Sequence, residues 1–364
     1  MYVNIWSWMR DFERTAQQQN DSQRLKLVNG YHDGWRCINS GHYDEALKHF
    51  ERALAIAQRI NEPCWELFLD SNCAEIFIFK KAESKIGLDR AIRIATRVYR
   101  PENEACPVRS RILCNLGYAY KDYDVFGYMD AILDLLNSIE NDVPMDHDSH
   151  LRLRFLRVEI AMELQQFDDA KKTVQVGLVE SFGNTYRMTQ SNALLSEIAY
   201  AQGDLHLALS YAAESGKHAY HGNMLRAVAS NFLWQAMLQR RIGNNGEAQN
   251  LLQQGLAEYE HHNLPRRESY YNHLCEFYEL LGDTDKALVL RQQQLKEVAE
   301  QTITAQSYAH LHHCRLLGRM GKSLDKALGN ARGITKQMKK PNLYLERIQQ
   351  IENGNYYLFA WQKV

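Results

Sequence analysis

Alanine recurs along this chain at nearly constant intervals. Successive members of the series are 45, 40, 39, 38, 40, 39 and 40 residues apart, and each opens an amphipathic segment. A small residue precedes each alanine, usually by 12 positions. The alanines are Ala46, Ala91, Ala131, Ala170, Ala208, Ala248, Ala287 and Ala327, and the small positions are Gly34, Ala74, Gly117, Val158, Ser196, Ala236, Cys275 and Cys314. A period of this length means that one supersecondary unit is reused, which predicts a stack of helical pairs.

The composition agrees with such a stack and disfavours several partners. The 364 residues include only 6 prolines, as expected where nearly every segment is helical. The 43 basic and 44 acidic residues give a formal net charge of −1, which does not favour a polyanionic partner such as nucleic acid. Apolar runs long enough to span a bilayer are absent from the sequence, so we expect no membrane partner.

The N-terminal segment and the cysteines indicate a cytoplasmic protein. Met1–Trp8 lacks a basic segment followed by a long apolar stretch, and so lacks the pattern of a secretory signal. The 7 cysteines form no CxxC pair and no even framework of disulfides. Cys275 and Cys314 stand where the repeat requires a small buried side chain. We therefore expect reduced thiols in a cytoplasmic protein.

The clearest copy of the repeat is the segment 41–54, which reads GHYDEALKHFERAL. Gly41 suits the end of one helix because glycine tolerates a left-handed backbone. Ala46, Phe50 and Ala53 are spaced four and three apart and so share one face of the next helix. Ala46 is small because two helices are expected to cross closely there.

This pattern resembles the tetratricopeptide repeat (TPR) family, whose second helix reads GxYxxAxxxFxxA. The segment 115–120, NLGYAY, resembles the first half of the same motif. The period near 40 is longer than the usual repeat of about 34 residues. In this respect the chain is similar to the long repeats of MalT-like and Rap-like arrays, the latter being peptide-sensing regulators.

The resemblance implies an all-α fold, a right-handed TPR-type α-solenoid of about eight helix-turn-helix repeats with terminal capping helices. We expect a capping helix within residues 1–24, the array over 25–340, and a final capping helix with an aromatic tail over 341–364. A longer loop is expected near residues 80–87. The tail follows an Asn-Gly-Asn turn and has a strand-like composition. It either folds back over the last repeat or serves as a contact for self-association.

In TPR arrays the first helix of each pair lines the concave surface, and this register predicts the partner-binding residues. Aromatic anchors, backbone-clamping amides and charged groups are expected there. The predicted contacts are Tyr31, Trp35, Asn72, Arg111, Asn115, Tyr118, Arg152, Gln190 and Glu197. The same register places further residues inward near the C-terminal end: Trp234, Met237, Arg240, Arg241, Asn272, His273, Glu276, Glu279, His312, Arg315 and Arg319.

Several of these residues also have a structural interpretation. Asn72 and Asn115 are either clamps for a peptide backbone or asparagines that bridge helices. The aromatic residues Tyr31 and Trp35 are either a pocket or ordinary core. These two residues also replace the polar side chains of the TPR site that binds two carboxylates, so a chaperone C-terminus is not the favoured ligand.

Signatures of chemistry are weak. His310, His312, His313 and Cys314 cluster in sequence, one repeat after His273 and Cys275, but their spacing matches no zinc site, so we expect no metal and no cofactor. The sequence contains no GxSxG, P-loop or HExxH motif.

We therefore expect a non-enzymatic scaffold that holds an extended protein or peptide segment in its groove. One alternative is a structural, homo-oligomeric component that associates through its aromatic termini. The other is a regulator that senses a peptide or small ligand.

Overall fold

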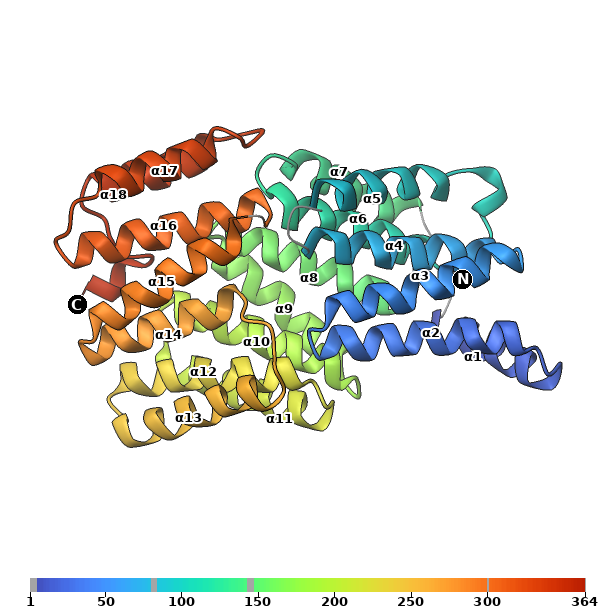
Figure 1. Cartoon of the computed structure of the whole chain (residues 1–364), viewed down its shortest axis with the longest axis horizontal. Helices are drawn as coiled ribbons and strands as arrows, with labels where there is room; N and C mark the ends of the chain where they lie inside the picture. The colour runs from blue at the N-terminus through green and yellow to red at the C-terminus, as the bar shows by residue number, and fades with distance from the viewer. Residues whose placement is uncertain (1–4, 80–83, 143–146, 300, 364) are drawn as a thin grey trace. The chain divides into compact units, whose positions relative to one another are not determined.

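The computed structural model describes residues 5–79, 84–142, 147–299 and 301–363, and within them it contains eighteen α-helices and no strand. The chain divides into two compact units, Met1–Leu156 and Arg157–Val364, each described here by itself. The helices of each unit pack as antiparallel pairs (Figure 1). The fold is thus all-helical and built as an α-solenoid, as predicted.

Unit 1 holds the first seven helices and the start of the eighth. They are α1 (Ile5–Gln18), α2 (Ser22–Asn39), α3 (Tyr43–Arg59), α4 (Pro63–Phe79), α5 (Ser84–Val98), α6 (Arg109–Asp124), α7 (Met129–Asp142) and α8 (His147–Glu163), with a 3-10 turn at Pro101–Asn103. Each helix from α1 to α6 packs on the next, and α4 also packs on α6, the first helix of the following pair.

Unit 2 begins within α8 and continues to the C-terminus. Its helices are α9 (Phe167–Glu180), α10 (Thr185–Ala201), α11 (Leu205–His221), α12 (Leu225–Ile242), α13 (Asn245–His261), α14 (Glu268–Leu281), α15 (Thr284–Val298), α16 (Ile303–Arg319), α17 (Asp325–Thr335) and α18 (Asn342–Glu352), with a 3-10 turn at Ala360–Lys363. α12 packs on both α13 and α14, and α16 packs on α15, α17 and α18.

The 12-residue spacing of the repeat is explained by a direct contact between the two helices of a pair. Ser196 Oγ on α10 donates a hydrogen bond to the carbonyl of Ala208 on α11, at 2.6 Å. The thiol of Cys275 on α14 makes the equivalent contact to the carbonyl of Ala287 on α15, at 3.4 Å. All four residues are buried. A larger side chain at either position would separate the helices, so both stay small.

In two of the helix pairs, a glycine followed by an aspartate forms the turn between the two helices. Gly282 ends α14 with φ 86°, a left-handed conformation that glycine adopts without strain. Asp283 then accepts a hydrogen bond from the backbone N–H of Lys286 and so caps α15. Asp204 caps α11 in the same way. This local chemistry fixes where one helix ends and the next begins.

The predicted terminal helices are confirmed as α1 and α18. The strand-like tail is wrong: residues 355–359 form no helix or strand, and a 3-10 turn follows them. Half of the long loop expected near residues 80–87, residues 80–83, lies outside the described residues, and α5 already begins at Ser84. In the described part of the chain, no helix combines the length and the apolar character needed to cross a bilayer.

Candidate functional site

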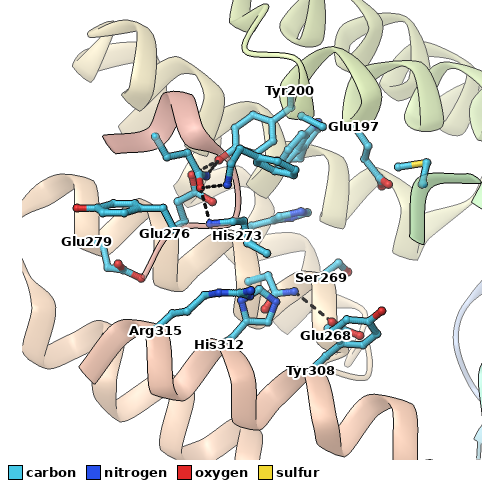
Figure 2. Close-up of a pocket in the computed structure, with 18 of the residues that line it drawn as sticks. Glu197, Tyr200, Glu268, Ser269, His273, Glu276, Glu279, Tyr308, His312 and Arg315 are labelled. Atoms are coloured by element: carbon cyan, nitrogen blue, oxygen red, sulfur yellow. Dashed lines mark hydrogen bonds between the residues drawn. The ribbon is translucent and has the colours of Figure 1, made fainter. Parts of the chain in front are cut away.

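Unit 2 contains a cavity of about 810 Å³. The end of α8 and the first helices α10, α12, α14 and α16 line it, together with Arg291 of α15, Arg347 of α18 and the tail that follows α18. Figure 2 shows side chains from these elements converging on one space, with Tyr200 and Glu197 on one side and Arg315 and His312 on the other. A space of this size is typical of ligand sites in proteins.

The inward register predicted from the sequence agrees with this lining. Ten cavity residues occupy positions that the register places on the inner wall: Glu197, Trp234, Arg241, Asn272, His273, Glu276, Glu279, His312, Arg315 and Arg319. The first helices of unit 2 therefore present their predicted inner face to an open space.

Aromatic side chains form one wall of the cavity. The Tyr200 ring lies 5.0 Å from the ring of Trp234 and 5.9 Å from that of Phe359, both edge-on. Trp361 also meets Tyr200 edge-on at 5.0 Å, and its Nε1 donates to the carbonyl of Ala201 at 3.1 Å. Two of these rings come from α10 and α12, and two from the tail. The tail is thus part of the wall.

The other end of the tail is held at the last repeat. Arg319 of α16 donates a hydrogen bond to the carbonyl of Tyr356. The Tyr356 ring lies directly on α16, because a Cβ added at Gly318 would come within 2.3 Å of its Cδ1 atom. Residues 356–362 therefore run from α16 to α10, beyond the last repeat over which the tail was predicted to fold.

We predict that Trp361→Ala lowers the free energy of unfolding by about 2 kcal/mol, below the 3–5 kcal/mol typical of a fully buried tryptophan, because Trp361 is half-buried. The change also removes the hydrogen bond to Ala201. Urea denaturation would measure it, with Trp6→Ala as the matched control, since Trp6 is 44% exposed. Equal effects of the two changes would show that the tail is not anchored at α10.

Ion pairs cross-link the floor of the cavity. Glu276 of α14 accepts hydrogen bonds from Arg241 of α12, at 2.5 Å, and from the hydroxyl of Tyr200. Arg319 binds Glu279 through Nε at 2.7 Å and Nη2 at 2.5 Å. Burial nevertheless raises the pKa of Glu279 above its ordinary value, and burial followed by the charge of Glu276 raises the pKa of Tyr200. The pairs hold neighbouring repeats at fixed distances.

A third cluster joins α8 to the C-terminal helices. The hydroxyl of Tyr308 on α16 donates to the carboxylate of Glu163, the last residue of α8. Arg347 of α18 donates to the Glu163 carbonyl at 3.2 Å and lies 3.8 Å from its carboxylate. These contacts join the end of α8 to α16 and α18 at the wall of the cavity.

Two histidines of the cavity are held neutral. Burial lowers the pKa of His273 to about 4. Burial also lowers the pKa of His312 well below its ordinary value, and four arginines add to this effect: Arg291, Arg315, Arg319 and Arg347. Neutral imidazoles offer both a donor and an acceptor, so these side chains can bind polar groups of a ligand near neutral pH.

Seven of the nine predicted contact residues lie in unit 1, where they contact other residues of that unit. The buried Tyr31 ring packs against those of Trp35, Phe50, Trp65 and Phe68, with centroids 5.4–6.4 Å apart. Desolvation raises its pKa. This is the core interpretation that the sequence left open.

The predicted cations of unit 1 are paired. Arg111 binds Asp148 at 2.6 Å and lies over the ring of Trp35. Arg152 binds Glu75 at 2.9 Å and lies 4.5 Å from the ring of Tyr118. The structure thus brings these residues together across α2, α4, α6 and α8, with carboxylates of the chain already bound to the arginines.

The two asparagines are buried and only half satisfied. Asn72 Nδ2 donates to the carbonyl of Phe68 at 2.8 Å, and Asn115 Nδ2 donates to Ser71 Oγ at 2.7 Å. Both Oδ1 atoms are buried without a hydrogen-bond partner. The two Nδ2 groups thus bond to other groups of the helices. That the two Oδ1 atoms bind a peptide backbone stays a prediction.

The remaining two predicted residues lie on α10 in unit 2. Gln190 is half-buried and accepts a hydrogen bond from Arg187 at 3.0 Å. Glu197 is exposed and lines the cavity. Of the nine residues, Glu197 alone belongs to this cavity.

Sequence reasoning missed Arg291, Tyr308, Arg347 and the tail as parts of the site. Arg291 stands on a second helix and Arg347 on the capping helix, neither of which the TPR register assigns to the inner face. The one available signal was the aromatic composition of the tail, which was read as a cover or a self-association contact. No local sequence pattern indicates that the tail extends as far as α10.

The described side chains do not form a metal centre. Within the described ranges, no three His, Cys, Asp or Glu side chains are grouped so that they could hold a metal ion. Cys314 and Cys275 are fully buried at their small-residue positions. The cavity is lined by aromatic rings, ion pairs and buried imidazoles.

No family model and no curated relative matches the sequence. Among solved structures, the chain is similar to one described as a Rap protein complexed with competence and sporulation factor, with a TM-score of 0.55 over 93% of this chain and 96% of that one. The two are 14% identical, so the likeness concerns the fold alone. The chain therefore has a TPR-type helical repeat architecture similar to that of a Rap protein.

Proposed function

We propose that unit 2 binds an extended peptide or partner-protein segment in the cavity between its first helices. The observation that carries this proposal is the tail. Residues 356–362 cross from α16 to α10, held by a carbonyl–arginine bond at one end and by packed aromatic rings at the other. The inner wall of unit 2 thus accommodates non-helical chain, and an open cavity lies beside it.

The solved neighbour supports the same function. Its description names a Rap protein complexed with competence and sporulation factor, so one protein of this fold holds a bound factor. In this chain, the wall of Tyr200 and Trp234 supplies rigid aromatic anchors, which contribute much of the free energy in peptide recognition. The neutral His273 and the amide of Asn272 supply polar contacts on the adjacent helix.

Self-association through the termini has less support. Trp8 packs on Trp65 with ring centroids 4.8 Å apart, and Phe359 and Trp361 pack on Tyr200. Trp6 is 44% exposed, which leaves a smaller aromatic surface than the sequence indicated. A partner segment in the cavity is therefore the function that we favour.

To test the proposal, a random library of octapeptides would be panned against the immobilised full chain. Selected peptides would then be measured by fluorescence anisotropy. We expect Trp234→Ala to weaken binding by about 10- to 100-fold, since loss of a central aromatic anchor costs roughly 2 kcal/mol. The matched control is Tyr220→Ala, because Tyr220 is 75% exposed on α11.

A second variant guards against misfolding of the first. Glu197 is exposed and lines the cavity, so Glu197→Lys should leave the melting temperature unchanged and still alter the affinity for selected charged peptides by at least about fivefold. If the peptides bind both cavity variants as tightly as the Tyr220→Ala control, they do not occupy the cavity and the proposal is wrong.

A further inference from the structure

Arg315 is a buried cation that no described side chain pairs with. Its side chain projects from α16 into the cavity beside His312 (Figure 2), and the residue is only 7% exposed. Its Nε atom is buried and makes no hydrogen bond. Among the described residues, Arg315 has no ion pair and donates to no carboxylate, in contrast to its neighbour Arg319, which binds Glu279. A buried guanidinium is normally paired with an anion, so Arg315 is suited to bind one from a ligand.

The surroundings of Arg315 are cationic rather than acidic. Burial, together with the charges of Arg347 and Arg319, lowers its pKa to about 10. Arg291 is 4% exposed and hydrogen bonds only to the amides of Asn272 and Gln294 within the described chain. His312, which faces both, is held neutral and adds no charge. Two guanidinium groups therefore remain at this end of the cavity without a carboxylate.

Four carboxylates of the cavity bind other residues. Glu163 binds Tyr308 and Arg347, Glu276 binds Tyr200 and Arg241, and Glu279 binds Arg319. Glu268 accepts a hydrogen bond from Asn272, and Glu197 lies on α10. No carboxylate in the described part of the chain is within ion-pair distance of Arg315 or Arg291. The positive charge at this end is thus left for a ligand.

We propose that Arg315, supported by Arg291 and His312, binds an oxyanion of the ligand, namely a carboxylate of the bound peptide. A guanidinium binds a carboxylate through two parallel hydrogen bonds, and burial strengthens them. Arg315 and the aromatic wall line the same cavity, so one peptide can contact both. This inference rests on the proposed function, because it names the chemistry of the segment that the cavity holds.

The first arm of the test needs no peptide. The melting temperature of the full chain would be followed with 0–50 mM sodium phosphate or sodium acetate at pH 7.0, with sodium chloride keeping the ionic strength constant. We expect the oxyanion to raise the melting temperature of the wild type by roughly 2–5 °C. Arg315→Met should abolish the rise and melt above the wild type when no oxyanion is added. The matched control is Arg266→Met, an exposed arginine of unit 2 outside the cavity.

The second arm uses the octapeptide library in two forms, with a free or an amidated C-terminus. We expect selected peptides to carry an acidic side chain or a free C-terminus, and Arg315→Met to weaken them at least tenfold. Amidation then shows which carboxylate is bound. Selection of peptides without an acidic side chain from the amidated library, bound as tightly as those from the free form, or equal binding by wild type and Arg315→Met, would overturn the carboxylate assignment.

The two arms separate this inference from the proposed function. If the anion effect depends on Arg315 but no peptide is selected, the anion site stands and the peptide function fails. If peptides bind at Trp234 without any preference for carboxylates, and oxyanions stabilise wild type and Arg315→Met equally, the peptide function stands and the anion site is wrong.

Discussion

Replacing Asp148 with alanine should lower the free energy of unfolding of unit 1 by about 3–5 kcal/mol. Asp148 Oδ2 lies 2.6 Å from Arg111 Nη1, and the two side chains are 10% and 7% exposed. Removing the carboxylate leaves the guanidinium buried and unpaired, and the cost of a buried charge then appears in full. Urea denaturation followed by circular dichroism would measure the change.

A matched surface pair gives the control. Lys85 and Asp89 on α5 are 2.6 Å apart, with side chains 62% and 48% exposed, so Lys85→Ala should cost less than about 0.5 kcal/mol. Replacing both buried partners, in an Arg111→Met, Asp148→Leu chain, should recover most of the loss, because no unpaired charge remains. A loss below about 1 kcal/mol for Asp148→Ala would show that Arg111 finds another anion or reaches water.

This pair also shows why the predicted contacts and the cavity lie in different units. Arg111 and Arg315 both occupy inward positions of first helices, and the sequence gives no reason to separate them. Their difference comes from the neighbouring repeat: Asp148 of α8 binds Arg111, whereas no carboxylate of the described chain reaches Arg315. Whether two side chains pair across repeats depends on how each helix is rotated about its own axis. The length of the repeat alone does not determine this rotation.

The repeat itself was predictable because its causes are local. A small residue packs against an alanine 12 positions later, as Ser196 does against Ala208, and this spacing can be found in the sequence itself. The glycine and aspartate at 203–204 and 282–283 add a second local signal. The course of the tail was not predictable, because its anchor at Tyr200 lies about 160 residues away and no periodicity connects the two.

Unit 2 should lose stability steeply as the pH falls from about 6.5 to 4. Burial lowers the pKa of His273 and of His313 to about 4, against an ordinary value of 6.5. Above pH 6.5 these imidazoles are neutral in both the folded and the unfolded state, so they do not make the free energy of unfolding depend on pH. Between pH 6.5 and 4 only the unfolded state binds the protons, so acid favours unfolding, and below 4 the loss saturates.

Each of these two histidines should cost roughly 2 kcal/mol across this range, so their sum is about 4 kcal/mol. His312 adds to the same trend, since burial and four arginines hold its pKa well below its ordinary value. Urea midpoints measured at pH 7.5, 6, 5 and 4.2 would give the profile. The variants His273→Asn and His313→Asn should each flatten it, and His206→Asn, which changes an exposed side chain of α11, should not.

The acid profile also reports on the arginine end of the cavity. His312 faces Arg315 and Arg291, so an oxyanion bound there would neutralise charge beside the imidazole and ease its protonation. In 50 mM phosphate the stability of the wild type should therefore fall less steeply with acid than in chloride, and Arg315→Met should remove that difference. A profile that is the same in both salts, with His273→Asn and His313→Asn unchanged from wild type, would mean that these imidazoles reach water in the folded protein.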